Sequence, residues 1–131
     1  MKISDVMTPS VYSVAADITV EAALDKMGLY KVRHMPVVDG GGMVGLLSER
    51  EARLCHYVCR TTETNPAVGE VCEKNPYIVN ELTDLSEVAL EMADRKIECA
   101  LVVNDSGDLM GIFTTTDACR VISMILEERA S

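Results

Sequence analysis

The sequence has no Trp and a single Phe, and aromatic residues make up only 4% of its 131 positions. Large aromatic rings therefore cannot fill a core, and the packing must come from aliphatic side chains and from eight Met. Apolar residues amount to 48%, and a chain of this length buries roughly two thirds of its unfolded surface. We expect one globular domain, or two small units that share a core, without disulfides or structural metal.

Basic residues are also few, since 12 Lys and Arg stand against 21 Asp and Glu, which gives a formal net charge of −9. General binding to nucleic acids or to anionic membranes needs a basic face. We therefore expect no nucleic-acid partner and no membrane partner. A small anionic ligand held by a few local Arg or Lys side chains stays compatible with this charge.

Long apolar runs are missing, and none approaches the roughly 20 residues of a bilayer-spanning helix. No charged and then apolar leader opens the chain, so we expect a cytoplasmic protein. The five Cys are an odd number, which argues against a disulfide framework and predicts reduced thiols.

The chain contains an internal repeat. A shift of 65 residues places residues 3–7 on 68–72, and one extra residue near Ser106 changes the shift to 66 for the strings that follow. The apolar positions agree throughout, which is typical of one supersecondary unit used twice. The predicted division is a first unit of residues 1–60, a linker of 61–67 and a second unit of 68–131.

Both units show the same order of predicted elements. Apolar residues at i, i+3, i+4 and i+7 predict a helix, and short apolar runs around turns predict paired strands. After a first strand, these elements are helices from Val20 and Leu85, strands at 35–38 and 100–103, strands at 43–47 and 109–113, and helices at 49–59 and 115–128. The predicted fold class is α/β, with two strand-helix-strand-strand-helix units packed sheet to sheet into one pseudo-symmetric module.

Three strings of the repeats carry a family resemblance: residues 33–39, 45–51 and 111–117. In their order, spacing and duplication, they resemble a tandem pair of cystathionine-β-synthase-type (CBS) domains, also called a Bateman module. The resemblance covers nearly the whole chain. Gly111-Ile112-Phe113-Thr114-Thr115-Thr116-Asp117 is similar to the family's Gly-h-x-Thr-x-x-Asp adenosine signature without a departure.

The resemblance implies a regulatory sensor that has no enzymatic activity and no cofactor and that acts as a homodimer. Such modules bind AMP, ADP, ATP or S-adenosylmethionine in the clefts between their two units. The signature carboxylate binds the ribose hydroxyls, the signature Thr or Ser reaches toward phosphate, and the adenine lies against apolar strand residues. The candidate ligand-binding residues are Thr114, Asp117, Ser48, Glu51, Arg33, His34, Val14 and Val79.

The residues of the second signature support this function independently of the family. A helix that begins after Thr114 directs free backbone N–H groups and the positive end of its dipole at one spot, which favours a phosphate. A carboxylate one turn further, at Asp117, can accept from two vicinal hydroxyls. The first repeat has Arg33-His34 where the second has Glu98-Cys99, so we expect the two sites to differ in charge.

A capping box is the structural alternative for both signatures. Glu is the residue that such a box uses, so Ser48 and Glu51 fit a cap and a ligand site equally well. The Asp side chain is one methylene shorter than that of Glu, so we expect it to fit such a box poorly. This favours ligand binding as the role of Asp117. We therefore expect the site of Thr114 and Asp117 to be the tighter of the two.

Cys55 and Cys59 lie at i and i+4 of a predicted helix, a spacing that suits two metal ligands or a thiol pair. The repeat, however, aligns them with Val121 and Ile125, and it aligns Cys72 with an apolar residue too. We therefore interpret these three thiols as structural and expect no metal. A ligand-free dimerisation or protein-docking scaffold stays open as an alternative function, and so does a thiol or metal sensor.

Overall fold

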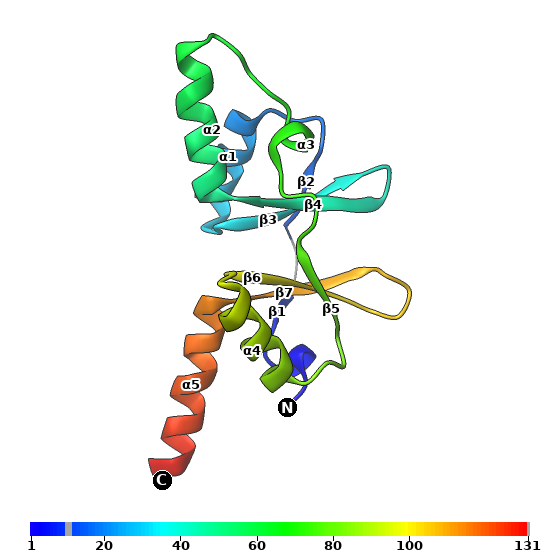
Figure 1. Ribbon diagram of the computed structural model, residues 1–131, viewed down its shortest axis with the longest axis vertical. Helices are drawn as coiled ribbons and strands as arrows, with labels where there is room; N and C mark the ends of the chain where they lie inside the picture. The colour runs from blue at the N-terminus through cyan, green and yellow to red at the C-terminus, as the bar shows by residue number, and fades with distance from the viewer. Residues whose placement is uncertain (10–11, 131) are drawn as a thin grey trace. The chain divides into compact units, whose positions relative to one another are not determined.

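The computed structural model describes residues 1–9 and 12–130 and confirms an α/β protein with two sheets. Every repeated helix and strand that the sequence predicts is present, with bounds that differ by one to a few residues at the ends (Figure 1). In chain order the elements are η1 (Ile3–Asp5), β1 (Thr8–Pro9), β2 (Val14–Ala15), α1 (Val20–Tyr30), β3 (His34–Asp39), β4 (Gly42–Ser48), α2 (Glu49–Thr61), α3 (Val68–Val71), β5 (Tyr77–Asn80), α4 (Leu85–Arg95), β6 (Cys99–Val103), β7 (Leu109–Thr114) and α5 (Thr115–Ala130).

The compact units of the structure differ from the repeats of the sequence. The continuous unit is Tyr12–Pro76, and the split unit combines Met1–Val11 with Tyr77–Ser131. The predicted boundaries at residues 60 and 68 follow the sequence repeat, but they do not separate the compact units. The beginning of each repeat packs instead against elements of the other repeat, an arrangement that we call segment exchange.

Backbone hydrogen bonds at two helix starts explain the segment exchange. The N–H group of Leu85, at the start of α4, donates to the carbonyl of Met1 at 2.9 Å. The N–H group of Val20, at the start of α1, donates to the carbonyl of Pro66 at 3.1 Å. The first N–H groups of a helix have no partner within it, so each exchanged segment satisfies a donor that would otherwise need water.

The continuous unit is a three-stranded sheet covered by helices. Its strand order is β2-β3-β4, with β2 parallel and β4 antiparallel to the central strand. Helices α1 and α2 lie side by side against this sheet (Figure 1). The buried core residues are Val14, Val20, Ala23, Met27, Met35, Val37, Leu47, Ala52, Val68 and Cys72.

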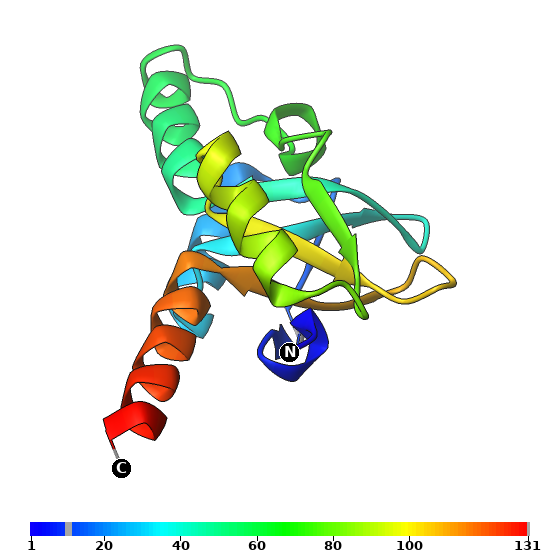
Figure 2. The same cartoon turned by 60° about the horizontal axis from the view of Figure 1, so that its bottom comes forward.

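The split unit is a four-stranded sheet with the order β1-β7-β6-β5. The exchanged strand β1 pairs antiparallel with β7, so that Thr8 lies opposite Ile112. Helix α5 leaves the end of β7, and its C-terminal half runs beyond the sheet (Figure 2). The buried core residues are Ile3, Val79, Val88, Met92, Ala100, Val102, Phe113 and Val121.

Two glycines allow the exchanged segments to approach the sheets closely. A Cβ atom on Gly111 would lie 2.6 Å from the carbonyl oxygen of Thr8, and one on Gly45 would lie 2.5 Å from the carbonyl oxygen of Glu73. Both distances are far below van der Waals contact. Gly111 and Gly45 begin the two signatures, so each signature also marks where a segment from the other repeat packs.

Candidate functional site

The carboxylate of Asp117 lies in the first turn of α5 and is buried in the split unit, with an exposed fraction of 4% for the residue. Its Oδ2 accepts from the backbone N–H of Thr114 at 2.9 Å and from the Thr114 hydroxyl at 3.2 Å. Its Oδ1 accepts from the Thr8 hydroxyl and from Arg120 Nη1, each at 2.9 Å. A carboxylate has about four acceptor positions, so protein donors occupy all of them.

Thr114 and Asp117 form a reciprocal capping box. Besides the bond from the Thr114 N–H to the carboxylate, the N–H of Asp117 faces the Thr114 hydroxyl oxygen at 3.4 Å. The prediction that the shorter Asp would fit this box poorly was therefore wrong. Thr114 is the last residue of β7, and the first turn of α5 folds back far enough for the shorter side chain to reach its N–H.

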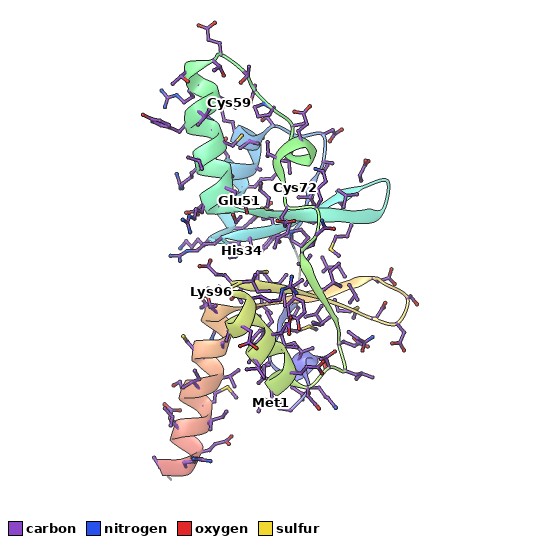
Figure 3. All side chains as sticks on the ribbon, in the orientation of Figure 1. Met1, His34, Glu51, Cys59, Cys72 and Lys96 are labelled. Atoms are coloured by element: carbon purple, nitrogen blue, oxygen red, sulfur yellow. The ribbon has the colours of Figure 1, made fainter. Side chains whose placement is uncertain are left out.

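The first signature is arranged differently at the start of α2. The Ser48 hydroxyl accepts from the Glu51 N–H at 3.1 Å and donates to Glu51 Oε1 at 2.8 Å. Within residues 1–9 and 12–130, no hydrogen bond joins the Ser48 N–H to the Glu51 carboxylate. The predicted capping box is therefore only half formed, since only the bond from the Glu51 N–H to the Ser48 hydroxyl is present. Glu51 is exposed, and Figure 3 shows it at the start of α2.

Arg33 and His34 lie beside the first signature. The Arg33 carbonyl accepts from the N–H of Glu49, the first residue of α2, at 2.7 Å. His34 lies opposite Ser48 in the antiparallel register of β3 and β4. The structure thus brings Arg33, His34, Ser48 and Glu51 together at one helix start, where the exposed Arg33 adds positive charge to the helix dipole.

Glu98 and Cys99 occupy the matching positions in the split unit. The Glu98 carbonyl accepts from the N–H of Thr115 at 3.1 Å, and Cys99 lies opposite Thr114 in the register of β6 and β7. Burial, and then the negative charge of Asp117, raise the pKa of the Cys99 thiol to about 12. A neutral thiol and an acidic residue therefore stand where the first signature has the imidazole of His34 and the cation of Arg33.

Val14 and Val79 belong to the hydrophobic cores of their units, with exposed fractions of 2% and 7%. Their side chains pack inside these cores. Successive residues of a strand point to opposite faces, so the neighbours Ala15 and Ile78 face away from the cores and are exposed.

Thr8 is the residue of this constellation that sequence reasoning missed. Its hydroxyl donates to a carboxylate 109 residues further along the chain, and only segment exchange brings the two groups together. The repeat aligns Thr8 with Glu73, whose carboxylate accepts from the Asn75 N–H at 2.8 Å. Among the described residues, no hydroxyl of an exchanged segment donates to the Glu51 carboxylate, which accepts from the Ser48 hydroxyl of its own signature.

Three of the five thiols, Cys55, Cys59 and Cys72, lie at positions that the repeat aligns with apolar residues, whereas Cys99 and Cys119 align with His34 and Arg53. Cys72 is in the core of the continuous unit, and Cys55 packs partly buried against it. The Sγ atoms of Cys55 and Cys59 are 3.8 Å apart, and burial, followed by this hydrogen bond, raises the pKa of Cys55. Among the described residues, no three His, Cys, Asp or Glu side chains are grouped so that they could hold a metal ion.

We predict that one thiol of the native protein reacts rapidly with a thiol reagent at pH 8. Cys119 is exposed, whereas Cys72 and Cys99 are buried and Cys55 and Cys59 are half-buried. At a pKa of about 12, on the order of one Cys99 thiol in 10⁴ is ionised at this pH. Absorbance titration of the Cys119→Ser variant should lose the fast phase completely, and a remaining fast phase would contradict the assignment.

The sequence matches the CBS domain family over residues 3–54 and 68–124. This match covers most of the chain, so the chain belongs to the CBS domain family. The two matched regions are the two repeats, which makes it a tandem CBS pair.

Three known proteins are similar to this chain in sequence or in fold. It is 31% identical over 125 residues to the zinc metalloprotease MJ0392 of Methanocaldococcus jannaschii. The aligned residues make up 95% of this chain but only 33% of that protein. The fold is similar to that of AcuB, a protein assigned to acetoin utilization in Vibrio cholerae, with a TM-score of 0.85, 26% identity, and coverage of 100% and 97% of the two chains. It is also similar to CBSX2, known from Arabidopsis thaliana, in a complex with AMP, with a TM-score of 0.79, 26% identity, and coverage of 95% and 97%.

The chain therefore spans about a third of the metalloprotease and nearly all of the two solved structures. Within residues 1–9 and 12–130, no helix combines the length and the apolar composition that crossing a membrane requires.

Proposed function

We propose that the protein is a regulatory module that senses an adenosine-type ligand, with AMP as the first candidate. The observation that carries this proposal is the duplicated pair of a hydroxyl and a carboxylate at the starts of α2 and α5. It is supported by the 26% identity to CBSX2, whose crystal structure contains AMP. The signal arises when bound ligand favours one conformation of the module over another.

The proposed ligand contacts follow from the chemistry of each helix start. Asp117 and Glu51 supply carboxylate oxygens for ribose hydroxyls, and Thr114 and Ser48 supply hydroxyls near the N–H groups that favour phosphate. Arg33 and His34 add basic groups at the first signature only. The described residues supply no comparable pair of basic groups at the second signature, where Arg120 already pairs with Asp117 at 2.9 Å.

Regulation, rather than catalysis, is the activity that we propose for this chain. The proteolytic activity in the name of the relative belongs to a protein about three times as long. We also propose a cytoplasmic location, without a nucleic-acid or membrane partner, because the net charge of −9 disfavours binding to polyanions.

Titration calorimetry of the wild-type chain with AMP, ADP, ATP and S-adenosylmethionine tests the proposed function. Saturable binding of at least one of them is expected, together with a rise of the melting temperature. A ligand at 100 times its Kd stabilises a protein by about 2.7 kcal/mol. If none of the four ligands binds or shifts the melting temperature, the scaffold alternative replaces the sensor.

We further propose that the module is a homodimer, and light scattering should give twice the chain mass of 14.3 kDa. The exposed apolar side chains of α2 and α5 motivate this prediction, because contiguous apolar patches on a protein surface mark interaction sites. They are Leu54, Tyr57, Val58, Ile122, Met124, Ile125 and Leu126.

A paired substitution checks which surface carries the dimer. Leu126→Glu on α5 is expected to give a monomer, whereas Leu82→Glu, at an equally exposed leucine outside the helices, should leave the dimer intact. A wild-type monomer, with and without ligand, would contradict the proposal.

A further inference from the structure

We propose that the Thr8 hydroxyl and the ribose of an adenosine ligand are alternative partners of Asp117, so that the N-terminal segment acts as a latch on this site. The inference concerns the regulation of the second signature and rests on the proposed function. It starts from the saturation of the Asp117 carboxylate by four protein donors.

Only two of these four donors can be displaced without unfolding the helix start. The N–H and hydroxyl of Thr114 bind Oδ2 as part of the capping box. Thr8 and Arg120 both bind Oδ1, one from an exchanged segment and the other from a side chain that is 64% exposed. A vicinal diol that binds this carboxylate must therefore take acceptor positions from Thr8 and Arg120.

The segment that carries Thr8 is held independently at its other end. Ile3 is fully buried in the core of the split unit, and Lys2 Nζ lies 2.7 Å from Asp84 Oδ1. Thr8 itself is exposed and belongs to the two-residue strand β1 at the edge of the sheet. Ligand binding is thus expected to loosen the Thr8 end of the segment, while Ile3 and Lys2 keep the other end attached.

The first signature provides an internal contrast. Glu51 is exposed, and Glu73, which the repeat aligns with Thr8, carries an acceptor and no donor. A ligand that binds Glu51 therefore has no hydroxyl of an exchanged segment to displace. The latch belongs to the second signature alone, which makes ligand binding at that site a signal to the N-terminal segment.

The test compares AMP affinities of single-residue variants by titration calorimetry. Thr8→Val removes the hydroxyl at nearly constant shape and should bind AMP about tenfold more tightly, since one competing hydrogen bond to a charged group is lost. Thr8→Ser keeps the hydroxyl and should bind like the wild type. Lys2→Ala, which loosens the same segment far from Asp117, should leave the affinity unchanged.

Two further measurements connect the effect to Asp117 and to the segment. The tightening should vanish when Thr8→Val is combined with Asp117→Asn, as a double-mutant cycle would show. Mass spectrometry should find that saturating AMP accelerates amide hydrogen exchange of residues 2–9 in the wild type. In Thr8→Val, the exchange of these residues should be the same with and without AMP.

Unchanged or weaker AMP binding by Thr8→Val would overturn the latch, and so would equal tightening in Lys2→Ala or slower hydrogen exchange with AMP. In each of these cases AMP still binds and the proposed function survives. If AMP binds Thr8→Val but not the wild type, the latch is supported in its strongest form. If AMP, ADP, ATP and S-adenosylmethionine bind neither protein, the proposed function itself fails, and the latch with it.

Discussion

Asp117→Ala is expected to lower the free energy of unfolding by about 2–4 kcal/mol. The substitution removes the partner of the Thr114 N–H at the start of α5, and loss of such a cap costs about 0.5–2 kcal/mol. It also leaves the part-buried Thr114 hydroxyl without its acceptor, at about 1–3 kcal/mol for a polar group that stays buried and unpaired, whereas the exposed Thr8 hydroxyl can bind water instead. Urea unfolding, followed by circular dichroism, measures the difference.

The same substitution is expected to weaken AMP binding by about one to two decades. The ribose hydroxyls would lose a charged acceptor, and a hydrogen bond of this type contributes about 1.5–3 kcal/mol. Asp117→Asn separates this effect from stability, because it keeps the shape of the side chain and one carbonyl acceptor while removing the charge. It should weaken AMP binding but cost less stability than Asp117→Ala.

Glu51→Ala is the matched control at the first signature. Glu51 is exposed, its carboxylate accepts from the Ser48 hydroxyl, and the backbone bond from its N–H to Ser48 survives truncation. We expect a loss of about 0.5 kcal/mol, as for surface substitutions in general. A larger loss of stability in Glu51→Ala than in Asp117→Ala would contradict the arrangement of the two signatures. A larger loss of AMP affinity would show that the first signature is the tighter site.

The elements of this fold could be predicted from the sequence because their signals are local. The apolar stripes that begin at Val20 and Leu85 and the apolar runs that became β3 and β6 need only neighbouring residues to be recognised. The duplicated strings then identified the family, since the repeat fixed their order and spacing. His34 and Ser48 of the first signature lie opposite each other in one strand pair, and Arg33 directly precedes it, so these residues could be placed for the same reason.

The segment exchange and its consequences could not be predicted in this way. Nothing local indicates that Thr8 meets Asp117 or that Leu85 donates to Met1, because these contacts depend on which repeat each segment packs against. The burial of the two valines among the candidate ligand-binding residues has another cause. Val14 and Val79 are apolar in both repeats because both cores need them, and a position that stays apolar in a repeat indicates packing before it indicates a ligand.

Gly111→Ala is expected to destabilise the protein by about 3 kcal/mol, and to lower its Tm by roughly 10 °C. The added Cβ would lie 2.6 Å from the Thr8 carbonyl oxygen and 2.7 Å from Met7 Sδ. The first neighbour is a backbone atom of β1, so relief requires the strand to move away from β7. The pairing of Thr8 with Ile112 and the hydrogen bond from Thr8 to Asp117 would then be lost together.

Two other glycines supply controls for this substitution. Gly28 lies within α1 with no atom within 4 Å of its added Cβ, so Gly28→Ala should stabilise the protein by about 1 kcal/mol. Gly45→Ala meets the Glu73 carbonyl oxygen at 2.5 Å and should cost about as much as Gly111→Ala, but in the continuous unit.

Hydrogen exchange distinguishes the two clashes, because each releases a different segment. Gly111→Ala should accelerate amide exchange in residues 2–9, whereas Gly45→Ala should accelerate it near Cys72 and Glu73 and leave residues 2–9 protected. Equal stability of Gly111→Ala and Gly28→Ala would mean that β1 does not pack against Gly111 in solution. Because the Thr8 hydroxyl reaches Asp117 only from this strand, that result would also remove the basis of the latch.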